Sequence, residues 1–105
     1  MSFTPVLPRD DLRDGDMRSV HVDGRGVLIV RFNGEVYAYE DRCAHQGVPL
    51  SEGTLHGYVL ACRAHEWLFD VRNGQGINPA LAFLRRFPVK IEDGQVLVDV
   101  GVPAA

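Results

Sequence analysis

Short apolar stretches alternate with turn signals along most of the chain. Asn-Gly and Asp-Gly dipeptides, which supply the positive φ angles of tight hairpin turns, separate many of these stretches. The stretches are rich in Val, Ile, Phe and Tyr and have the length of strands. We therefore expect strands over residues 17–22, 27–32, 35–40, 58–61, 67–70, 87–92 and 95–100.

The strongest hairpin signal is Asn33-Gly34, which joins two of the predicted strands. A two-residue loop at this point places five side chains on one face of the sheet. We expect that face to point inward; it consists of Leu28, Val30, Phe32, Tyr37 and Tyr39. Asp93-Gly94 predicts a second hairpin near the end of the chain.

Helical signals are weak in comparison. We expect about one helical turn at 8–12 and a short helix over 79–85, which Pro88 closes. The length of 105 residues predicts a single domain, 1–105. The pattern as a whole predicts an all-β fold, a small antiparallel β-sandwich or open barrel, with irregular segments near 41–57, 62–66 and 72–86.

Composition and charge exclude several classes of partner. The chain is 46% hydrophobic and 24% charged with a net charge of −3, which disfavours nucleic acid and anionic membranes and favours a basic partner surface. Apolar runs are of strand length, so no membrane span is expected. The first residues lack a basic segment followed by an apolar one, and the cytoplasm is the expected compartment.

The two cysteines of the chain each lie beside a histidine, in Cys43-Ala44-His45 and in Cys62-Arg63-Ala64-His65. A disulfide would leave both histidines unexplained and suits a secreted protein better. Each pair directly follows a predicted strand. Two such loops at one end of a rigid sheet can converge on a common site.

Two thiolates and two imidazoles suit either zinc or an iron–sulfur cluster. Common structural zinc sites pair like with like, as C-x₂₋₄-C and H-x₃₋₅-H. Here each loop brings one Cys and one His, which meets the requirement of a Rieske [2Fe–2S] centre, where one iron takes two Cys and the other takes two His.

The pattern C-x-H-x₁₆-C-x₂-H in a small β protein resembles the Rieske ferredoxin family. The stretches LSEGTLHGYVLACRAHEWLFDVRNGQGINP and FPVKIEDGQVLVDV most resemble the Rieske ferredoxin component of toluene-type diiron monooxygenases, over roughly positions 27 to 100. The resemblance implies a Rieske fold with two cluster-binding loops at one end. It also implies one [2Fe–2S] cluster, with Cys43 and Cys62 on one iron and His45 and His65 on the other. Residues 76–79 would form a third, proline-bearing loop over the cluster.

The function implied by the resemblance is electron transfer rather than catalysis. The protein would carry single electrons from an NADH-dependent flavin and iron–sulfur reductase to the hydroxylase of a multicomponent aromatic monooxygenase. Three alternatives stay open: the ferredoxin of a Rieske aromatic-ring dioxygenase, a structural zinc-binding domain, and an enzyme with a Cys nucleophile activated by His. The sequence has no third Cys and no Ser after His65, which predicts a reduction potential in the lower part of the Rieske range.

Several residues near the ligands have less defined roles. His21 and His56 are expected at the surface. Trp67 suits either core packing or a functional role, as a shield beside the cluster or a contact with the partner. Gln46 and Arg63 suit either solvated loops or the rim of a docking surface. Asp41 and Glu52 flank the first ligand loop; we expect a solvated face, with steering of a partner as the alternative.

Overall fold

The computed structural model describes residues 3–42, 49–63, 67–78, 80 and 82–101. They form three antiparallel sheets, with the strand orders β1-β11-β10, β2-β3-β4-β9 and β5-β6-β7-β8. Two short 3₁₀ helices, η1 (Arg9–Asp11) and η2 (Leu50–Glu52), complete the secondary structure. In this described part of the chain there is no α-helix, and no helix long and apolar enough to cross a membrane. The predicted all-β, antiparallel class is confirmed.

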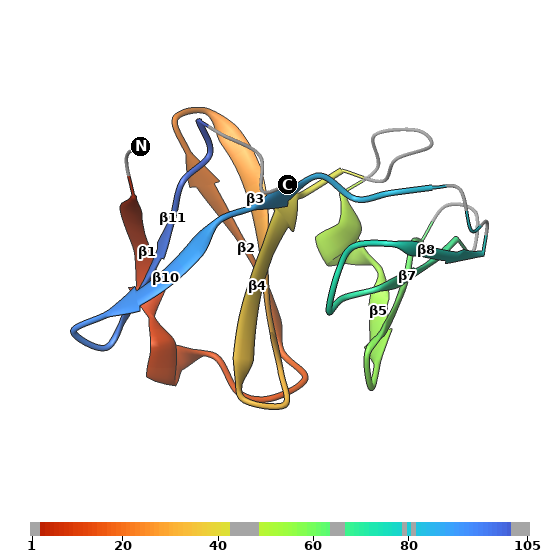
Figure 1. The fold of residues 1–105 in the computed structure, drawn as a ribbon, viewed down its shortest axis with the longest axis horizontal. Helices are drawn as coiled ribbons and strands as arrows, with labels where there is room; N and C mark the ends of the chain where they lie inside the picture. Colours follow the sequence, from red (N-terminus) through yellow and green to blue (C-terminus); the bar gives the residue numbers. More distant parts are fainter. Residues whose placement is uncertain (1–2, 43–48, 64–66, 79, 81, 102–105) are drawn as a thin grey trace.

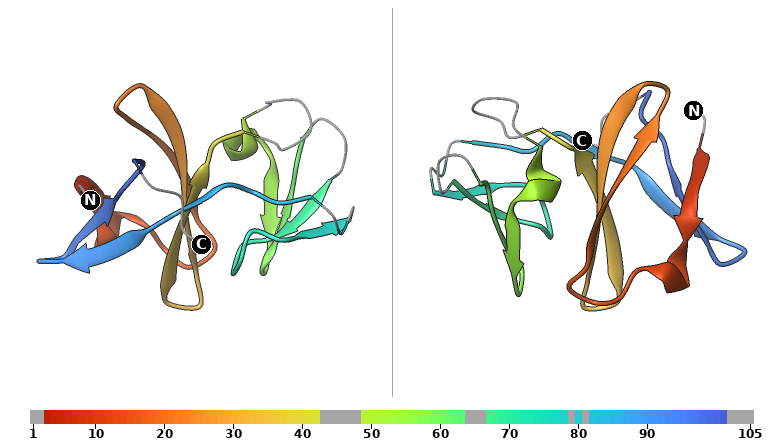
Figure 2. Two further views of the ribbon diagram at one scale, coloured as in Figure 1. Left: turned by 45° about the horizontal axis from the view of Figure 1, so that its top comes forward. Right: turned by 180° about the vertical axis from the view of Figure 1, so that it is seen from behind.

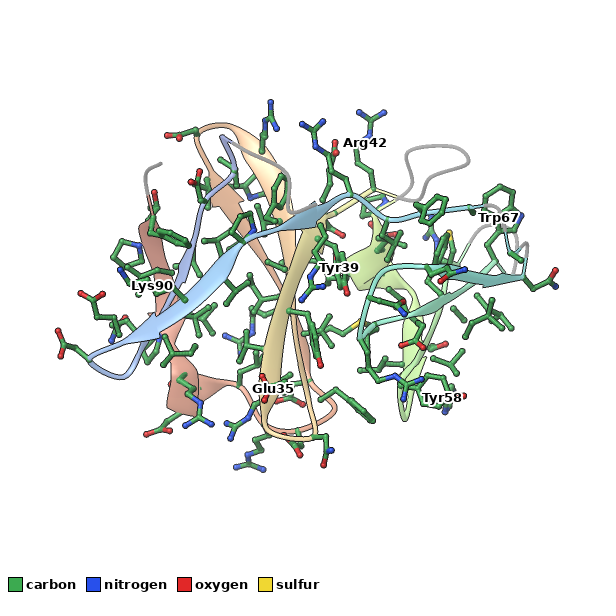
Figure 3. The ribbon with its side chains drawn as sticks, in the orientation of Figure 1. Glu35, Tyr39, Arg42, Tyr58, Trp67 and Lys90 are labelled. Atoms are coloured by element: carbon green, nitrogen blue, oxygen red, sulfur yellow. The ribbon has the colours of Figure 1, made fainter. Side chains whose placement is uncertain are left out.

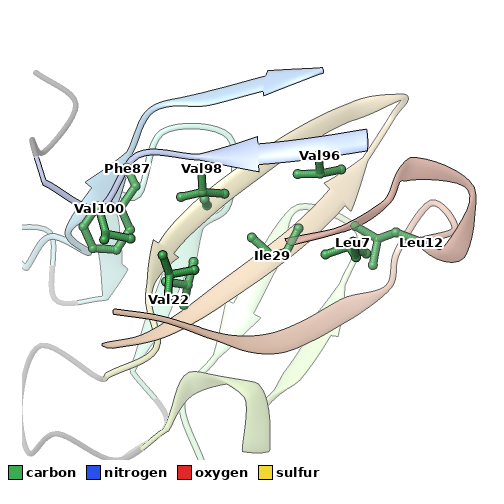
Figure 4. Packing of buried hydrophobic residues seen from close by; sticks show 10 residues of the cluster. Leu7, Leu12, Val22, Ile29, Phe87, Val96, Val98 and Val100 are labelled. Atoms are coloured by element: carbon green, nitrogen blue, oxygen red, sulfur yellow. The ribbon is translucent and has the colours of Figure 1, made fainter. Parts of the chain in front are cut away.

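Two of the sheets pack face to face over the first core. One sheet contains β1 (Thr4–Pro8), β10 (Val89–Glu92) and β11 (Gln95–Val98), and the other contains β2 (Met17–Val22), β3 (Arg25–Phe32), β4 (Glu35–Glu40) and β9 (Arg86–Phe87). Figure 4 shows the buried side chains between them, including Leu7, Val22, Ile29, Phe87 and Val98. Alternate positions of β3 and β11 supply this core, as the period of two in a strand requires.

The predicted hairpin between β3 and β4 is confirmed, since Leu28 pairs with Tyr39 and Val30 pairs with Tyr37. Leu28, Val30 and Tyr39 are fully buried in a second core, and Phe32 and Tyr37 pack against it. The opposite face of β3 is buried as well, in the first core. The β2-β3-β4-β9 sheet is therefore covered on both sides, which explains the uninterrupted apolar run of β3.

The third sheet covers the Tyr39 face of β4. It is built from β5 (Thr54–His56), β6 (Val59–Ala61), β7 (Leu68–Asp70) and β8 (Gly76–Asn78). Figures 1 and 2 show this small sheet on one side of β4, with β1, β10 and β11 on the other. The Tyr39 hydroxyl donates a hydrogen bond to the Val71 carbonyl, and Gly74, with a φ of 79°, packs on the Tyr39 ring. Tyr39 therefore fastens the third sheet to the rest of the molecule.

The structure differs from the sequence predictions at three points. Strands β1, β5 and β8 were not predicted. Strand β1 contains Pro5 and Pro8, which lack a backbone N–H. It lies at the edge of its sheet, where a missing N–H is tolerated. The strand predicted at 87–92 is interrupted at Pro88 and joins two sheets. The helix predicted over 79–85 is wrong for its described residues. The Gly76 N–H donates to the Ala82 carbonyl at 2.7 Å, and the Leu84 N–H donates to the Gly74 carbonyl at 2.8 Å. Pairing with the neighbouring strand prevails over the weak local helix signal.

Candidate metal centre

Of the four predicted ligands, the described part of the chain contains Cys62. Cys43, His45 and His65 lie outside the described residues. Among the described residues, no group of three or more His, Cys, Asp or Glu side chains could hold a metal ion, so the complete ligand set remains a sequence prediction. The structure does show how the bases of both predicted ligand loops are built.

The base of the first loop is closed by Asp41, which follows β4 and is 9% exposed. Its carboxylate accepts hydrogen bonds from the Ser51 N–H at 2.9 Å and from the Ser51 hydroxyl at 2.8 Å. The Ser19 hydroxyl donates a third, at 2.8 Å. A buried carboxylate needs such partners, because an unpaired charge is costly to bury. The expectation of a solvated Asp41 is wrong; Asp41 ties the two ends of segment 42–50 together.

The base of the second loop is closed by a backbone hydrogen bond, from the Cys62 N–H to the Trp67 carbonyl at 2.8 Å. It continues the β6–β7 ladder, in which Ala61 pairs with Leu68. Cys62 is not part of a disulfide with any described residue and is 2% exposed within the second core. Strand pairing thus fixes the backbone position of Cys62, and with it the place of this thiol at the loop base.

Gly53 brings the two bases together. A Cβ built on Gly53 would lie 2.1 Å from the Ala61 carbonyl oxygen, so no other residue allows this approach of η2 to the end of β6. Outside this contact, the Glu52 carboxylate pairs with the Arg63 guanidinium at 3.0 Å, both side chains being largely exposed. Glu52 and Arg63 are thus solvated, as expected, and they also link the two loops.

A cleft of about 610 Å³ lies along one face of the third sheet, beside the end of η2 and the start of the second loop. Its lining includes Glu52, Gly53, His56, Cys62, Arg63 and Asn78. The last belongs to β8, at the start of the predicted third loop. A buried thiol at the base of one loop, with the base of the other loop packed beside it, fits a metal cluster held by both loops. The described residues are therefore compatible with the predicted [2Fe–2S] centre.

The structure also shows where the two remaining histidines and Trp67 lie. His21 and His56 are exposed, as expected. Trp67 is half-buried and packs against the second core, with its ring 6.4 Å from that of Phe69, so the core-packing interpretation is confirmed. The third-sheet strands carrying His56 and Asn78 were not predicted, and nothing in the sequence placed either residue at the cleft.

Comparison with known proteins decides the family. Residues 2–88 match the family model of the Rieske [2Fe–2S] domain. The chain belongs to this family. Cys-and-His-ligated [2Fe–2S] clusters define Rieske centres, so membership implies the predicted cofactor.

Curated relatives of this Rieske protein are ferredoxin components of oxygenase systems. It is 46% identical to the ferredoxin component of the alkene monooxygenase system of Xanthobacter autotrophicus strain Py2, over 93% of this chain and 81% of the relative. It is 33% identical to the ferredoxin component of the naphthalene 1,2-dioxygenase system of Pseudomonas putida, over 95% and 97% of the two chains.

Solved structures agree with the predicted Rieske fold. The complex of reduced oxygenase and oxidized ferredoxin in carbazole 1,9a-dioxygenase contains a chain that superposes with a TM-score of 0.89 at 32% identity, covering 98% of this chain and 96% of that one. The Sphingomonas yanoikuyae B1 ferredoxin gives a TM-score of 0.84 at 25% identity, covering 93% and 98%. The resemblance to Rieske ferredoxins and the fold class are both confirmed.

Proposed function

We propose that this protein is the ferredoxin component of a multicomponent monooxygenase and that its whole length, 1–105, is one Rieske domain. It carries single electrons to a terminal oxygenase and is not itself an enzyme. The observation that carries the proposal is the 46% identity, over 93% of the chain, to a ferredoxin component of a monooxygenase system. The aromatic substrate, an NADH-dependent flavin and iron–sulfur reductase, and a cytoplasmic location are predictions from the sequence.

Four residues of this chain would hold the cluster. Cys43 and Cys62 supply thiolates to one iron, and His45 and His65 supply imidazoles to the other. When bound, the cluster accepts and returns one electron. Because neutral imidazoles would leave less negative charge on their iron than thiolates would, His45 and His65 would favour the electron on their side of a bound cluster. The burial of Cys62 keeps water from the thiolate side.

The structure supports this arrangement through the loop bases. Asp41 closes the first loop, and the Cys62 N–H closes the second. Gly53 holds the two bases in contact. Such fixed bases allow ligands on two loops to meet at one cluster without a large loss of conformational entropy.

The cofactor is tested by electron paramagnetic resonance of the dithionite-reduced protein, with iron and acid-labile sulfide counted on the same sample. We expect about two irons and two sulfides per chain, and a lower average g value than all-thiolate clusters give. Cys62→Ser should lose this signal, whereas Ser2→Ala should keep it. A colourless protein that contains zinc and no sulfide would favour the structural zinc domain instead.

The second candidate function is the ferredoxin of a Rieske aromatic-ring dioxygenase. The 33% identity to a naphthalene 1,2-dioxygenase ferredoxin component favours it, since that match covers nearly both chains. Reconstitution separates the two. Turnover with a diiron hydroxylase and not with a Rieske dioxygenase supports the monooxygenase role, and the reverse result supports the second candidate.

A further inference from the structure

A second cleft, of about 340 Å³, lies where β3 begins and β4 ends. It is lined by Gly24, Arg25, Gly26, Glu40, Arg42 and Arg85. All three arginines are exposed. They come from three separate places in the sequence, so the fold, rather than a basic run, brings them together.

Backbone hydrogen bonds fix the arrangement of this arginine cleft. The Asp41 N–H donates to the Gly26 carbonyl at 3.0 Å, beside Arg25. The Glu40 N–H donates to the Arg85 carbonyl at 2.8 Å. Figure 3 shows Arg42 pointing outward at the end of β4 opposite to Glu35. Arg42 immediately precedes Cys43, so the cleft adjoins the base of the first ligand loop.

The cleft is positively charged because its arginines exceed its acids. Glu40 is the lining carboxylate, 4.0 Å from the Arg42 guanidinium. The Arg25 guanidinium donates to the Val100 carbonyl at 3.3 Å and forms no ion pair with a carboxylate of the described residues. The Arg85 guanidinium has no hydrogen-bond or ion-pair partner among the described residues.

Nearby acids offset this charge only in part. Asp41 is buried outside the lining of the cleft, and its carboxylate accepts hydrogen bonds from Ser19 and Ser51. Asp23 lies at the exposed tip of the β2–β3 turn, outside the lining. The arginine cleft is therefore positive although the whole chain has a net charge of −3, from which we expected a basic partner. Like charges gathered without partners do not stabilise a fold, but they do favour association with an acidic surface.

We infer that the arginine cleft docks an acidic surface patch of the terminal oxygenase, next to the cluster end of this protein. The inference rests on the proposed function. Guanidinium groups bind carboxylates in a bidentate manner, which orients a partner as well as attracting it. The net negative charge of the chain opposes an extended polyanion, so a local carboxylate patch fits better than nucleic acid. A solved structure similar to this chain is a complex with an oxygenase, which makes that partner the one to test.

The test compares two double variants that remove the same charge. Arg42→Gln/Arg85→Gln neutralises the cleft, and Arg13→Gln/Arg18→Gln neutralises exposed sites near the opposite end of the β2–β3 ladder. Each holoprotein is titrated against the oxygenase that it supports in reconstitution, at several ionic strengths. Iron content and reduction potential are measured on every variant.

We expect the cleft variant to raise the apparent KM for the ferredoxin on the order of tenfold at low salt, with a shallower salt dependence and unchanged maximal turnover. The control variant should change the KM by less than about twofold. Equal KM values for the two variants, at parental iron content and potential, would overturn the docking inference and leave the proposed function standing. A defect confined to reduction by the reductase would overturn the choice of partner. If no oxygenase accepts electrons from the holoprotein, the proposed function fails and the inference fails with it.

Discussion

Asp41 and Ser51 are joined by two hydrogen bonds, from the Ser51 N–H and from its hydroxyl, across the ends of the first predicted ligand loop. Asp41→Asn keeps the shape of the side chain but replaces one acceptor oxygen with a donor. We expect a loss of about 1–3 kcal/mol in the free energy of unfolding, because a buried donor loses its acceptor. Iron content after purification should fall as well. Asp10→Asn, at an exposed site, is the control. Full iron content and parental stability in Asp41→Asn would show that the loop does not depend on this contact.

Gly53→Ala should disturb the contact between the two loop bases. Its φ of −82° suits any residue, so the effect comes from crowding: the new Cβ would meet the Ala61 carbonyl oxygen at 2.1 Å. We expect a cost of about 1–3 kcal/mol, as for other overpacked sites, and poorer cluster incorporation. Gly57→Ala is the comparison, because Gly57 has a φ of 61° and open space around it. Its cost of about 1 kcal/mol should leave iron content unchanged. Equal iron content in the two variants would argue against a role for Gly53 in the site.

The hydrophobic pattern predicted the central part of this fold well. Asn33-Gly34 and the alternation around it located β3 and β4 and the face that carries Tyr39. Very short strands were missed, and so was β1, which pairs with the distant β11. Strand β8 has three residues and no alternation to detect, and Ala82 and Leu84, which follow it, form backbone hydrogen bonds with Gly76 and Gly74 instead of a helix.

The ligand pattern could be predicted from the sequence because the spacing of Cys and His within each loop indicates the kind of metal site. The residues that support the two loops, Asp41 and Gly53, could not be predicted in this way. Asp41 looks like any surface acid until Ser19 and Ser51, from distant segments, surround it. Gly53 looks like a turn residue until the Ala61 carbonyl lies against it. Both depend on tertiary contacts that no local pattern reports.

Tyr39→Phe should weaken the attachment of the third sheet. The phenol is fully buried, and burial raises its pKa well above the usual value, so the hydroxyl stays protonated and donates to the Val71 carbonyl. We expect a loss of about 1–2 kcal/mol, since the carbonyl keeps its buried position without this donor. Denaturant unfolding followed by circular dichroism measures it. Tyr58→Phe, at a site that is 40% exposed, should be nearly neutral. A parental unfolding curve for Tyr39→Phe would contradict this account.

His65→Cys tests the ligand assignment directly. A third thiolate adds negative charge to the irons, so we expect an assembled cluster with a more negative reduction potential and an altered optical spectrum. Redox titration of the purified holoprotein measures the shift. His21→Cys adds a thiol at an exposed histidine of β2, outside the cleft that Cys62 lines, and should leave both properties unchanged. A parental spectrum and potential in His65→Cys would refute His65 as a ligand.

Asp70 should make part of the stability depend on acid pH. The Arg72 guanidinium donates to both carboxylate oxygens, at 2.7 and 3.0 Å, and these hydrogen bonds lower the pKa of Asp70 below its ordinary value of 3.8. The folded state therefore holds the ionised form more strongly than the unfolded state does. This contribution is complete well above pH 3.8 and is lost as the pH falls through the lowered pKa. Because Arg72 is half exposed, solvent screening limits it to less than about 1 kcal/mol. Asp70→Asn should flatten the decline of unfolding free energy between about pH 5 and 2, relative to the parent and to Asp10→Asn. Parallel pH profiles for parent and Asp70→Asn would show that the pair is too well solvated to contribute.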